Sequence, residues 1–132
     1  MENGNFRKAV TSSGKLMLAG KNAETNEKLI EQVGKEELVF HTAKPGSPFV
    51  NIKLEDGEKY SQKDVQEAAI FCAKYSQDWK KAKIKKDVDV HYFLGKDIFK
   101  LKDMKLGTFG VKGYKEMRVK KINIENFNEK NN

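Results

Sequence analysis

Cysteine is almost absent from this sequence, which has one cysteine and two histidines in 132 residues. A single cysteine excludes an internal disulfide, and one cysteine with two histidines gives no spacing typical of a zinc site. No apolar run is long enough to cross a membrane, and the polar residues Met1 to Asn5 are unlike a signal peptide. We therefore expect a soluble, cytoplasmic protein without metal or cofactor.

Catalytic motifs are missing as well. The sequence contains no G-x-S-x-G elbow, G-x-G-x-x-G fingerprint, P-loop or H-E-x-x-H pair. Residues 107–113 are rich in glycine, but no Gly-Lys-Ser or Gly-Lys-Thr follows them. Cys72 lies within the apolar stripe of a predicted helix, with no base placed to activate it, so we expect an inert buried thiol. No residue receives a catalytic role.

Positive charge is in excess, and it is unevenly distributed. The formal net charge is +7, and residues 80–121 hold 14 Lys and Arg against 5 Asp and Glu. The rest of the chain holds 12 against 14. This asymmetry is typical of a protein with a polyanionic partner, and nucleic acid is favoured over a membrane because no wide apolar helix face accompanies the lysines. The alternative explanation is a genome-wide bias toward lysine. Such a bias would raise the total number of lysines, but it explains their clustering less well.

The pattern along the chain predicts an α+β fold in one domain, residues 1–124, followed by a disordered tail at 125–132. Apolar segments predict strands at 6–11, 15–19, 36–42, 49–54, 88–92 and 114–124. A short helix begins after residue 22, and a long one runs from Ser61 to about Trp79, where Ser61 and Asp64 resemble a capping box. We expect a mostly antiparallel sheet of about six strands, with the longer of two main helices packed across one face.

Two short patterns are candidates for binding. At Gly20-Lys21-Asn22 a strand turns into a helix, and the capped helix start with Lys21 is either an anion site or an ordinary corner with a solvated lysine. Later, Phe40-His41 ends a strand before the loop Pro45-Gly46-Ser47, in which Gly46 allows close approach. His41 either faces a ligand together with Ser47 or satisfies a loop carbonyl, and the residues leave both interpretations open.

As a set, these patterns resemble the NFACT-R family of RNA-binding domains. The family's glycine–basic–Asn corner is similar to Gly20-Lys21-Asn22, with Asn26 as its second Asn, and its strand-His and Pro-Gly-Ser feature is similar to His41 and Pro45-Gly46-Ser47. Glu67-Ala68-Ala69 and Tyr75-Ser76 resemble its later helix. The resemblance covers about residues 6 to 122 and is specific only when the motifs are taken together.

The resemblance implies a role on the translation machinery, because NFACT proteins are associated with stalled large ribosomal subunits and tRNA in ribosome-associated quality control. Their N-terminal domain, helix–hairpin–helix region and coiled coils have no counterpart in this sequence. We therefore expect a stand-alone NFACT-R protein without nascent-chain tailing activity.

Together these observations predict a non-catalytic module that binds tRNA or ribosomal RNA. Lysines neutralise phosphates, and exposed aromatic rings stack on unpaired bases, for which Tyr92, Phe109 and Tyr114 are placed if they face outward. The predicted nucleic-acid-binding residues are Lys21, Asn22, Asn26, His41, Pro45, Gly46, Ser47, Lys80, Lys81, Lys83, Lys85, Lys86, Lys112, Lys115 and Arg118. Two alternatives stay open: a protein-interaction adaptor whose lysines only maintain solubility, and a small nucleic-acid enzyme that uses His41 and Ser47.

Overall fold

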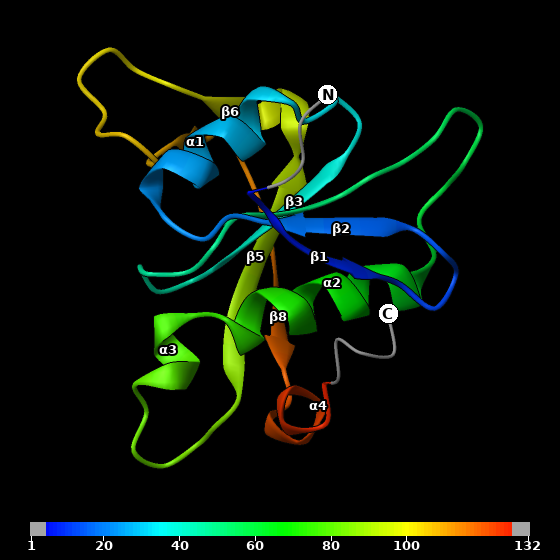
Figure 1. Ribbon diagram of the computed structural model, residues 1–132, viewed down its shortest axis with the longest axis vertical. Helices are drawn as coiled ribbons and strands as arrows, with labels where there is room; N and C mark the ends of the chain where they lie inside the picture. Colours follow the sequence, from blue (N-terminus) through cyan, green and yellow to red (C-terminus); the bar gives the residue numbers. More distant parts are fainter. Residues whose placement is uncertain (1–4, 128–132) are drawn as a thin grey trace.

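The computed structural model describes residues 5–127, and they form the predicted α+β fold (Figure 1). The main sheet has six strands in the order β1-β2-β4-β3-β5-β8, all antiparallel, and β6 and β7 form a separate two-stranded sheet. The strands are β1 (Arg7–Val10), β2 (Leu16–Ala19), β3 (Leu38–Thr42), β4 (Val50–Ile52), β5 (Val88–Leu94), β6 (Ile98–Phe99), β7 (Gly110–Val111) and β8 (Lys115–Val119). The helices are α1 (Ala23–Glu31), α2 (Gln62–Lys74), α3 (Gln77–Lys80) and α4 (Lys121–Glu125), with a 3-10 turn at Gly95–Asp97.

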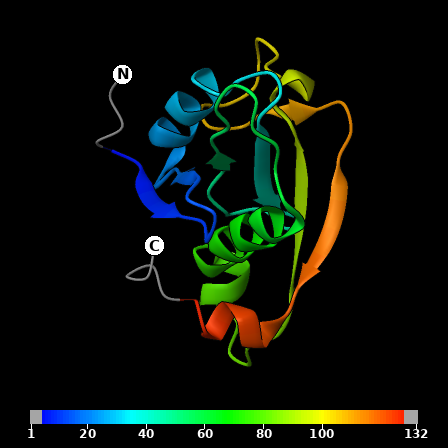
Figure 2. The same cartoon turned by 90° about the vertical axis from the view of Figure 1, so that its right-hand side faces the viewer.

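Helices cover both faces of the main sheet. Side chains of neighbouring residues in a strand point to opposite faces, so each strand contributes to both contacts. In β3, Phe40 packs with α2, whereas Val39 packs with Leu29 of α1. Figures 1 and 2 accordingly show α1 and α2 on opposite sides of the sheet. The longer helix thus lies across one face, as predicted. Its Cys72 is fully buried, and burial raises the pKa of the thiol to about 12, so it is inert.

The predicted long helix ends earlier than expected. It breaks after α2 at Tyr75 and Ser76, and the short α3 follows. The Ser76 hydroxyl donates to the carbonyl of Ala73 at 2.8 Å and accepts from the N–H of Trp79 at 3.2 Å. One side chain therefore closes α2 and caps α3, a change of direction that the continuous apolar periodicity does not reveal.

The prediction of a last strand from 114 to 124 is wrong in its second half. β8 ends at Val119, and residues 121–125 form α4, whose Ile124 is buried beside α2. Phe127 stacks on Phe71 with ring centroids 5.6 Å apart, so the folded chain extends past residue 124. Residues 1–4, and the part of the predicted tail at 128–132, lie outside the described residues. None of the helices within residues 5–127 combines the length and the apolar character needed to span a membrane.

Two carboxylates of α2 hold the turn between β1 and β2: that of Glu67, which accepts from the Ser12 N–H at 2.8 Å, and the buried one of Asp64. Its oxygens accept from the Ser13 hydroxyl at 2.7 Å and from the Ser61 N–H at 2.9 Å, and they pair with Lys15 Nζ at 3.0 Å. The Ser61–Asp64 capping box predicted from the sequence is confirmed. Burial opposes the charge of Asp64, but these donors outweigh it and hold the pKa of the carboxyl well below its usual range.

Replacing Asp64 by Asn is expected to lower the free energy of unfolding by about 3 kcal/mol, because it leaves the buried Lys15 ammonium without a counterion. Since the carboxyl pKa is lower in the folded state, its stabilisation is present above an unfolded pKa of about 4 and is lost as the pH falls toward the folded pKa. Urea unfolding of wild type and Asp64→Asn between about pH 2 and pH 7 measures both effects.

The matched control is Asp56→Asn, which removes an exposed carboxylate from a loop. It should change the free energy of unfolding by less than about 0.5 kcal/mol. A loss of acid sensitivity in Asp56→Asn comparable to that in Asp64→Asn would contradict the assignment.

Candidate nucleic-acid interface

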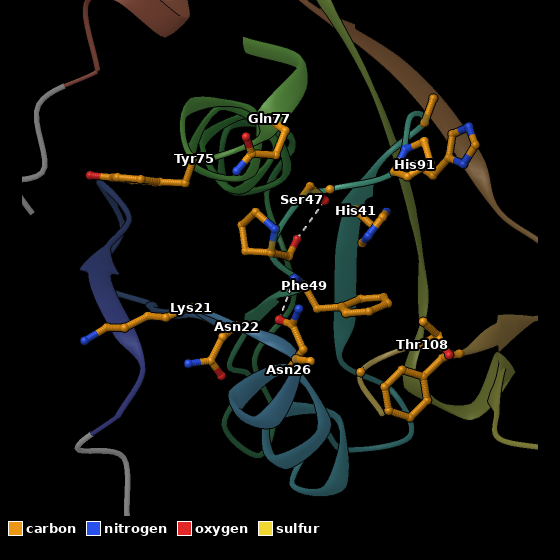
Figure 3. A pocket seen from close by; sticks show the side chains of 18 of the residues that line it. Lys21, Asn22, Asn26, His41, Ser47, Phe49, Tyr75, Gln77, His91 and Thr108 are labelled. Atoms are coloured by element: carbon orange, nitrogen blue, oxygen red, sulfur yellow. Dashed lines mark hydrogen bonds between the residues drawn. The ribbon is translucent and has the colours of Figure 1, made fainter. Parts of the chain in front are cut away.

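A cleft of about 730 Å³ opens between the start of α1 and the strands β3 and β5 (Figure 3). Its walls also include the loop after β3, the junction of α2 and α3, and residues 106–109. The predicted site residues that line it are Lys21, Asn22, Asn26, His41, Pro45, Gly46, Ser47 and Lys80. The cleft thus unites the two short sequence patterns, although they lie on different elements.

The corner at Lys21 and Asn22 uses most of its polar groups internally. Asn22 is the N-cap of α1, as predicted, because its Oδ1 accepts from the Thr25 N–H at 2.9 Å. In return, Thr25 Oγ1 accepts from the N–H groups of Asn22 at 3.0 Å and Lys21 at 2.7 Å. These three N–H groups are already paired, so what the corner offers a ligand is chiefly the exposed Lys21 ammonium.

Asn26 joins α1 to the sheet. Its Oδ1 accepts from the Phe49 N–H at 3.1 Å, just before β4 begins. A Cβ atom on Gly20 would lie 2.0 Å from this oxygen, so the glycine is required for close approach. A left-handed backbone is not the reason for this glycine, since Gly20 is not among the described glycines with positive φ.

The Pro-Gly-Ser loop is likewise held by internal contacts. Ser47 is buried, accepts from the Thr42 N–H at 3.0 Å and donates to the Pro48 carbonyl at 3.0 Å. Gly46 has a φ of +89°, and its carbonyl accepts from the Gln77 N–H at 2.8 Å, which fixes the loop to the start of α3. Ser47 therefore shapes the cleft wall, and its proton is donated to the Pro48 carbonyl.

His41 satisfies a backbone carbonyl, which is one of the two interpretations that its sequence left open, and its ring also lines the cleft. Nδ1 lies 2.8 Å from the Thr42 carbonyl, which can only accept, so Nδ1 carries the proton. The other nitrogen, Nε2, has no hydrogen-bond partner among the described residues and is an acceptor when the ring is neutral. Burial lowers the pKa of His41, outweighing the bond to Thr42, and nearby His91 lowers it further. The side chain is thus a neutral acceptor in the cleft wall at pH 7.

Several aromatic side chains surround His41. His91 lies directly opposite it on β5 and stacks on Tyr114, with centroids 3.9 Å apart, and Tyr114 is 59% exposed. Phe109 is partly buried and lines the cleft. Tyr92 faces the other side of the sheet and stacks on Phe40 in the core. Of the three aromatic candidates, Tyr92 is therefore unable to meet a ligand here.

The predicted basic residues differ in whether they line the cleft and in whether they already have a partner within the protein. Lys80 lies in the cleft wall, but Lys85 donates to the Trp79 carbonyl at 2.6 Å, a helix-end contact. Lys86 pairs with Asp78 at 2.9 Å, and Arg118 pairs with Asp89 at 2.9 Å. The predicted residues outside the cleft lining are Lys81, Lys83, Lys85, Lys86, Lys112, Lys115 and Arg118.

Arg7, Tyr75, Gln77 and His91 also line the cleft, and sequence reasoning assigned none of them to it. The Arg7 guanidinium lies 4.0 Å from the centre of the Tyr75 ring, in a cation–π contact. Because β1 and the end of α2 are far apart in sequence, no local pattern indicates this contact.

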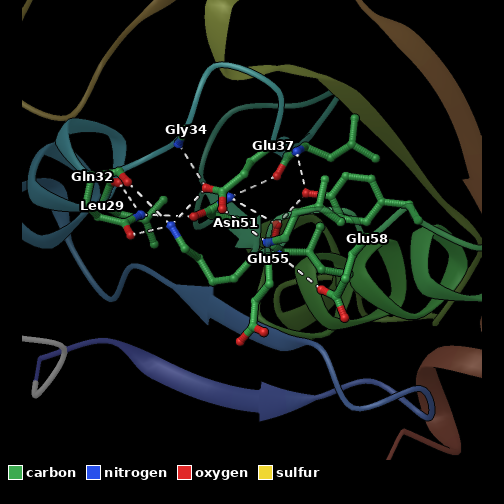
Figure 4. A network of polar contacts seen from close by, with 12 residues as sticks. Leu29, Gln32, Gly34, Glu37, Asn51, Glu55 and Glu58 are labelled. Atoms are coloured by element: carbon green, nitrogen blue, oxygen red, sulfur yellow. Dashed lines mark hydrogen bonds and ion pairs between the residues drawn. The ribbon is translucent and has the colours of Figure 1, made fainter.

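α1, which carries the corner, is fixed at both of its ends. Beyond its C-terminal end, Gln32 Nε2 donates to Asn51 Oδ1 at 3.0 Å, and Lys53 Nζ bridges Gln32 and Glu37 at 2.8 Å each (Figure 4). Within α1, Glu27 Oε1 accepts from the Gly107 N–H at 2.7 Å.

The loop before β7 is held by Lys100. Its Nζ pairs with Glu27 at 3.1 Å, donates to the carbonyls of Lys105 at 2.6 Å and Thr108 at 2.8 Å, and lies 4.6 Å from the centre of the Phe109 ring. The cleft wall formed by residues 106–109 is therefore attached directly to α1. No group of three or more His, Cys, Asp or Glu within residues 5–127 is arranged to hold a metal ion.

The protonation state of His41 is testable by two-bond ¹H–¹⁵N NMR of labelled histidines. We expect the Nδ1–H tautomer at pH 7, and a titration midpoint below about 6.5, the ordinary histidine value, because burial disfavours the charged ring. A protonated His41 at neutral pH, or the Nε2–H tautomer, would contradict the acceptor role.

Comparison with known proteins identifies the family. The model of the family described as "NFACT protein RNA binding domain" matches residues 5–113. The archaeal Rqc2 homolog aRqcH of Methanocaldococcus jannaschii is 38% identical over 69 residues, which are 52% of this chain and 10% of that protein.

A solved structure supports the same assignment. The C-terminal part of the fibronectin/fibrinogen-binding protein of Streptococcus suis superposes with a TM-score of 0.77 at 26% identity, over 95% of this chain and 49% of that one. The chain thus spans a tenth of the archaeal relative's length and about half of the solved chain. Since the family model matches most of the sequence, from the first strand to the start of β8, the chain belongs to the NFACT RNA-binding domain family.

Proposed function

We propose that this protein binds RNA without catalysis, through the cleft and the basic surface next to it, in ribosome-associated quality control. The observation that carries the proposal is the cleft itself, which brings cations and aromatic rings from α1, α3, β1 and the loop before β4 to one place. The family's description names RNA binding, and the archaeal relative is named as an Rqc2 homolog. Its targets would be tRNA or ribosomal RNA of the large subunit, which would place the protein in the cytoplasm.

Three cations at the cleft support this proposal: Arg7, Lys21 and Lys80. Lys21 and Lys80 are exposed, and no acidic side chain is paired with either among the described residues. Free ammonium groups of this kind gain affinity for RNA by releasing counterions from phosphates. Lys85 and Arg118, by contrast, already have internal partners.

The enzyme alternative receives no support from the geometry. A nucleophile needs a base within hydrogen-bond reach, but Ser47 donates to the Pro48 carbonyl and His41 donates to the Thr42 carbonyl. The adaptor alternative does not account for a cleft that is lined by both cations and rings. It is the outcome to accept if no nucleic acid binds.

The test is a fluorescence-anisotropy titration of the full chain with tRNA, a large-subunit ribosomal RNA fragment and a DNA duplex of matched length, at several salt concentrations. We expect log Kd to rise linearly with log salt for RNA, and RNA to bind more tightly than DNA. Absence of binding to every substrate at low salt would reject the proposal.

The variant Lys21→Gln/Lys80→Gln should weaken RNA binding and reduce the salt slope by about 1 to 2, corresponding to two lost phosphate contacts. Lys59→Gln/Lys63→Gln is the matched control, because it removes the same charge from two exposed lysines outside the cleft. If both double variants reduce the slope equally, binding depends on total charge, and the cleft is not the interface.

A further inference from the structure

Five aromatic side chains line the cleft in two groups of contacting rings, which together we call the aromatic row: Tyr114 with His91, and His41 with Phe49 and Phe109. Tyr114 stacks on His91 at 3.9 Å with the rings inclined by 17°, and His91 lies opposite His41 across β5 and β3. The His41 ring lies 4.6 Å from that of Phe49, which meets Phe109 edge to face at 5.6 Å. His41, Phe109 and Tyr114 were candidates from the sequence, whereas His91 and Phe49 join them only through the folding of the chain.

The cations occupy a different part of the cleft. Figure 3 shows Lys21 and Tyr75 on one side, His91 and Thr108 on the other, and His41 and Phe49 between them. Arg7 lies on the Tyr75 ring at 4.0 Å, and Lys80 lies 5.6 Å from the same ring. The cleft therefore has an aromatic side and a cationic side.

This division matches the two chemical parts of a nucleotide. A base presents a π-face that stacks on aromatic rings, and its phosphate seeks ammonium or guanidinium groups. In a duplex the faces of the bases are covered by their neighbours, so only an unpaired nucleotide can offer both parts. The cavity volume of about 730 Å³ is in the range of about 300–1,000 Å³ that is typical of small-molecule sites.

We propose that the cleft binds an unpaired nucleotide of an RNA strand, with its base against the aromatic row and its phosphates toward Arg7, Lys21 and Lys80. The proposal rests on the proposed function and narrows it from RNA to a single-stranded end, loop or bulge. The basic residues outside the cleft would contact the adjoining phosphates without regard to pairing.

His41 adds a directional contact. Its Nε2 is an acceptor without a partner among the described residues, so it can take an N–H or O–H group but repels phosphate oxygens. The donors that a nucleotide offers are the exocyclic amino groups and ring N–H groups of the bases and the ribose 2′-hydroxyl. A base or ribose edge therefore fits this part of the cleft, and a phosphate does not.

The experiment compares two RNAs in the anisotropy assay: a blunt duplex, and the same duplex with a four-nucleotide 3′ overhang. We expect the overhang to lower Kd by about tenfold or more, since stacking of one base on an aromatic side chain contributes that order of affinity. The preference for the overhang should weaken as salt rises but should not vanish, because its phosphates would meet the cations of the cleft while stacking of its base releases few counterions.

Tyr114 allows a matched pair of variants, because it is exposed and its replacement leaves the core intact. Tyr114→Phe keeps the ring and should retain the preference for the overhang. Tyr114→Leu keeps an apolar side chain without the π-face and should reduce the preference severalfold. A 2-aminopurine in the overhang should show quenched fluorescence on binding to wild type and to Tyr114→Phe, and weaker quenching with Tyr114→Leu.

The outcomes separate this inference from the function on which it rests. Equal, salt-dependent binding of both RNAs, or a preference that Tyr114→Leu leaves unchanged, overturns the unpaired-nucleotide site and keeps general RNA binding. Failure of both RNAs to bind at low salt overturns both proposals. An overhang preference that depends on the Tyr114 ring supports both.

Discussion

The cleft depends on the attachment of α1 to the sheet through the hydrogen bond between Asn26 Oδ1 and the Phe49 N–H. This contact lets the helix start and the beginning of β4 face each other, and it is possible because Gly20 leaves room for the asparagine. An unpaired amide at Phe49 would cost free energy, since its surroundings are largely buried. At the far end, Gln32, Lys53 and Glu37 hold the helix by partly buried polar contacts, so α1 is fixed along its length.

In the cleft, the residues that hold the backbone in place differ from those that have polar groups left for a ligand. Asn22, Asn26 and Ser47 were predicted as nucleic-acid contacts, but each already bonds to backbone N–H groups that shape the cleft. Groups that are free for a ligand, such as the Lys21 ammonium and His41 Nε2, lie between them. A motif that looks like a binding signature can thus be a folding requirement, because the geometry of a cleft is fixed by the residues that satisfy its backbone.

Much of the fold could be predicted from the sequence, because strands and capped helices have local signatures. Ser61 and Asp64 marked the start of α2, and Asn22 that of α1. The break at Ser76 and the start of α4 after Val119 could not be predicted. In both places the apolar pattern of the sequence continues although the chain changes direction. The lining of the cleft could be anticipated only where its residues were close in sequence, as at Lys21 and His41. Contacts such as Arg7 on Tyr75 require the finished sheet.

Charge alone would have placed the interface on the lysines and arginine of the C-terminal third, whereas the cleft includes only Lys80 from that set and adds Arg7, Lys21 and several rings. In that region Lys85, Lys86 and Arg118 have partners that orient them, whereas Lys80 lies at the cleft. The surplus charge raises the local concentration of any polyanion over a wide surface, but it has no means to distinguish one polyanion from another. Discrimination needs rigid groups with direction, and these are the stacked rings of His91 and Tyr114 and the single acceptor of His41. If the cleft binds RNA as proposed, affinity and selectivity would therefore arise from different residues, which meet at one cleft.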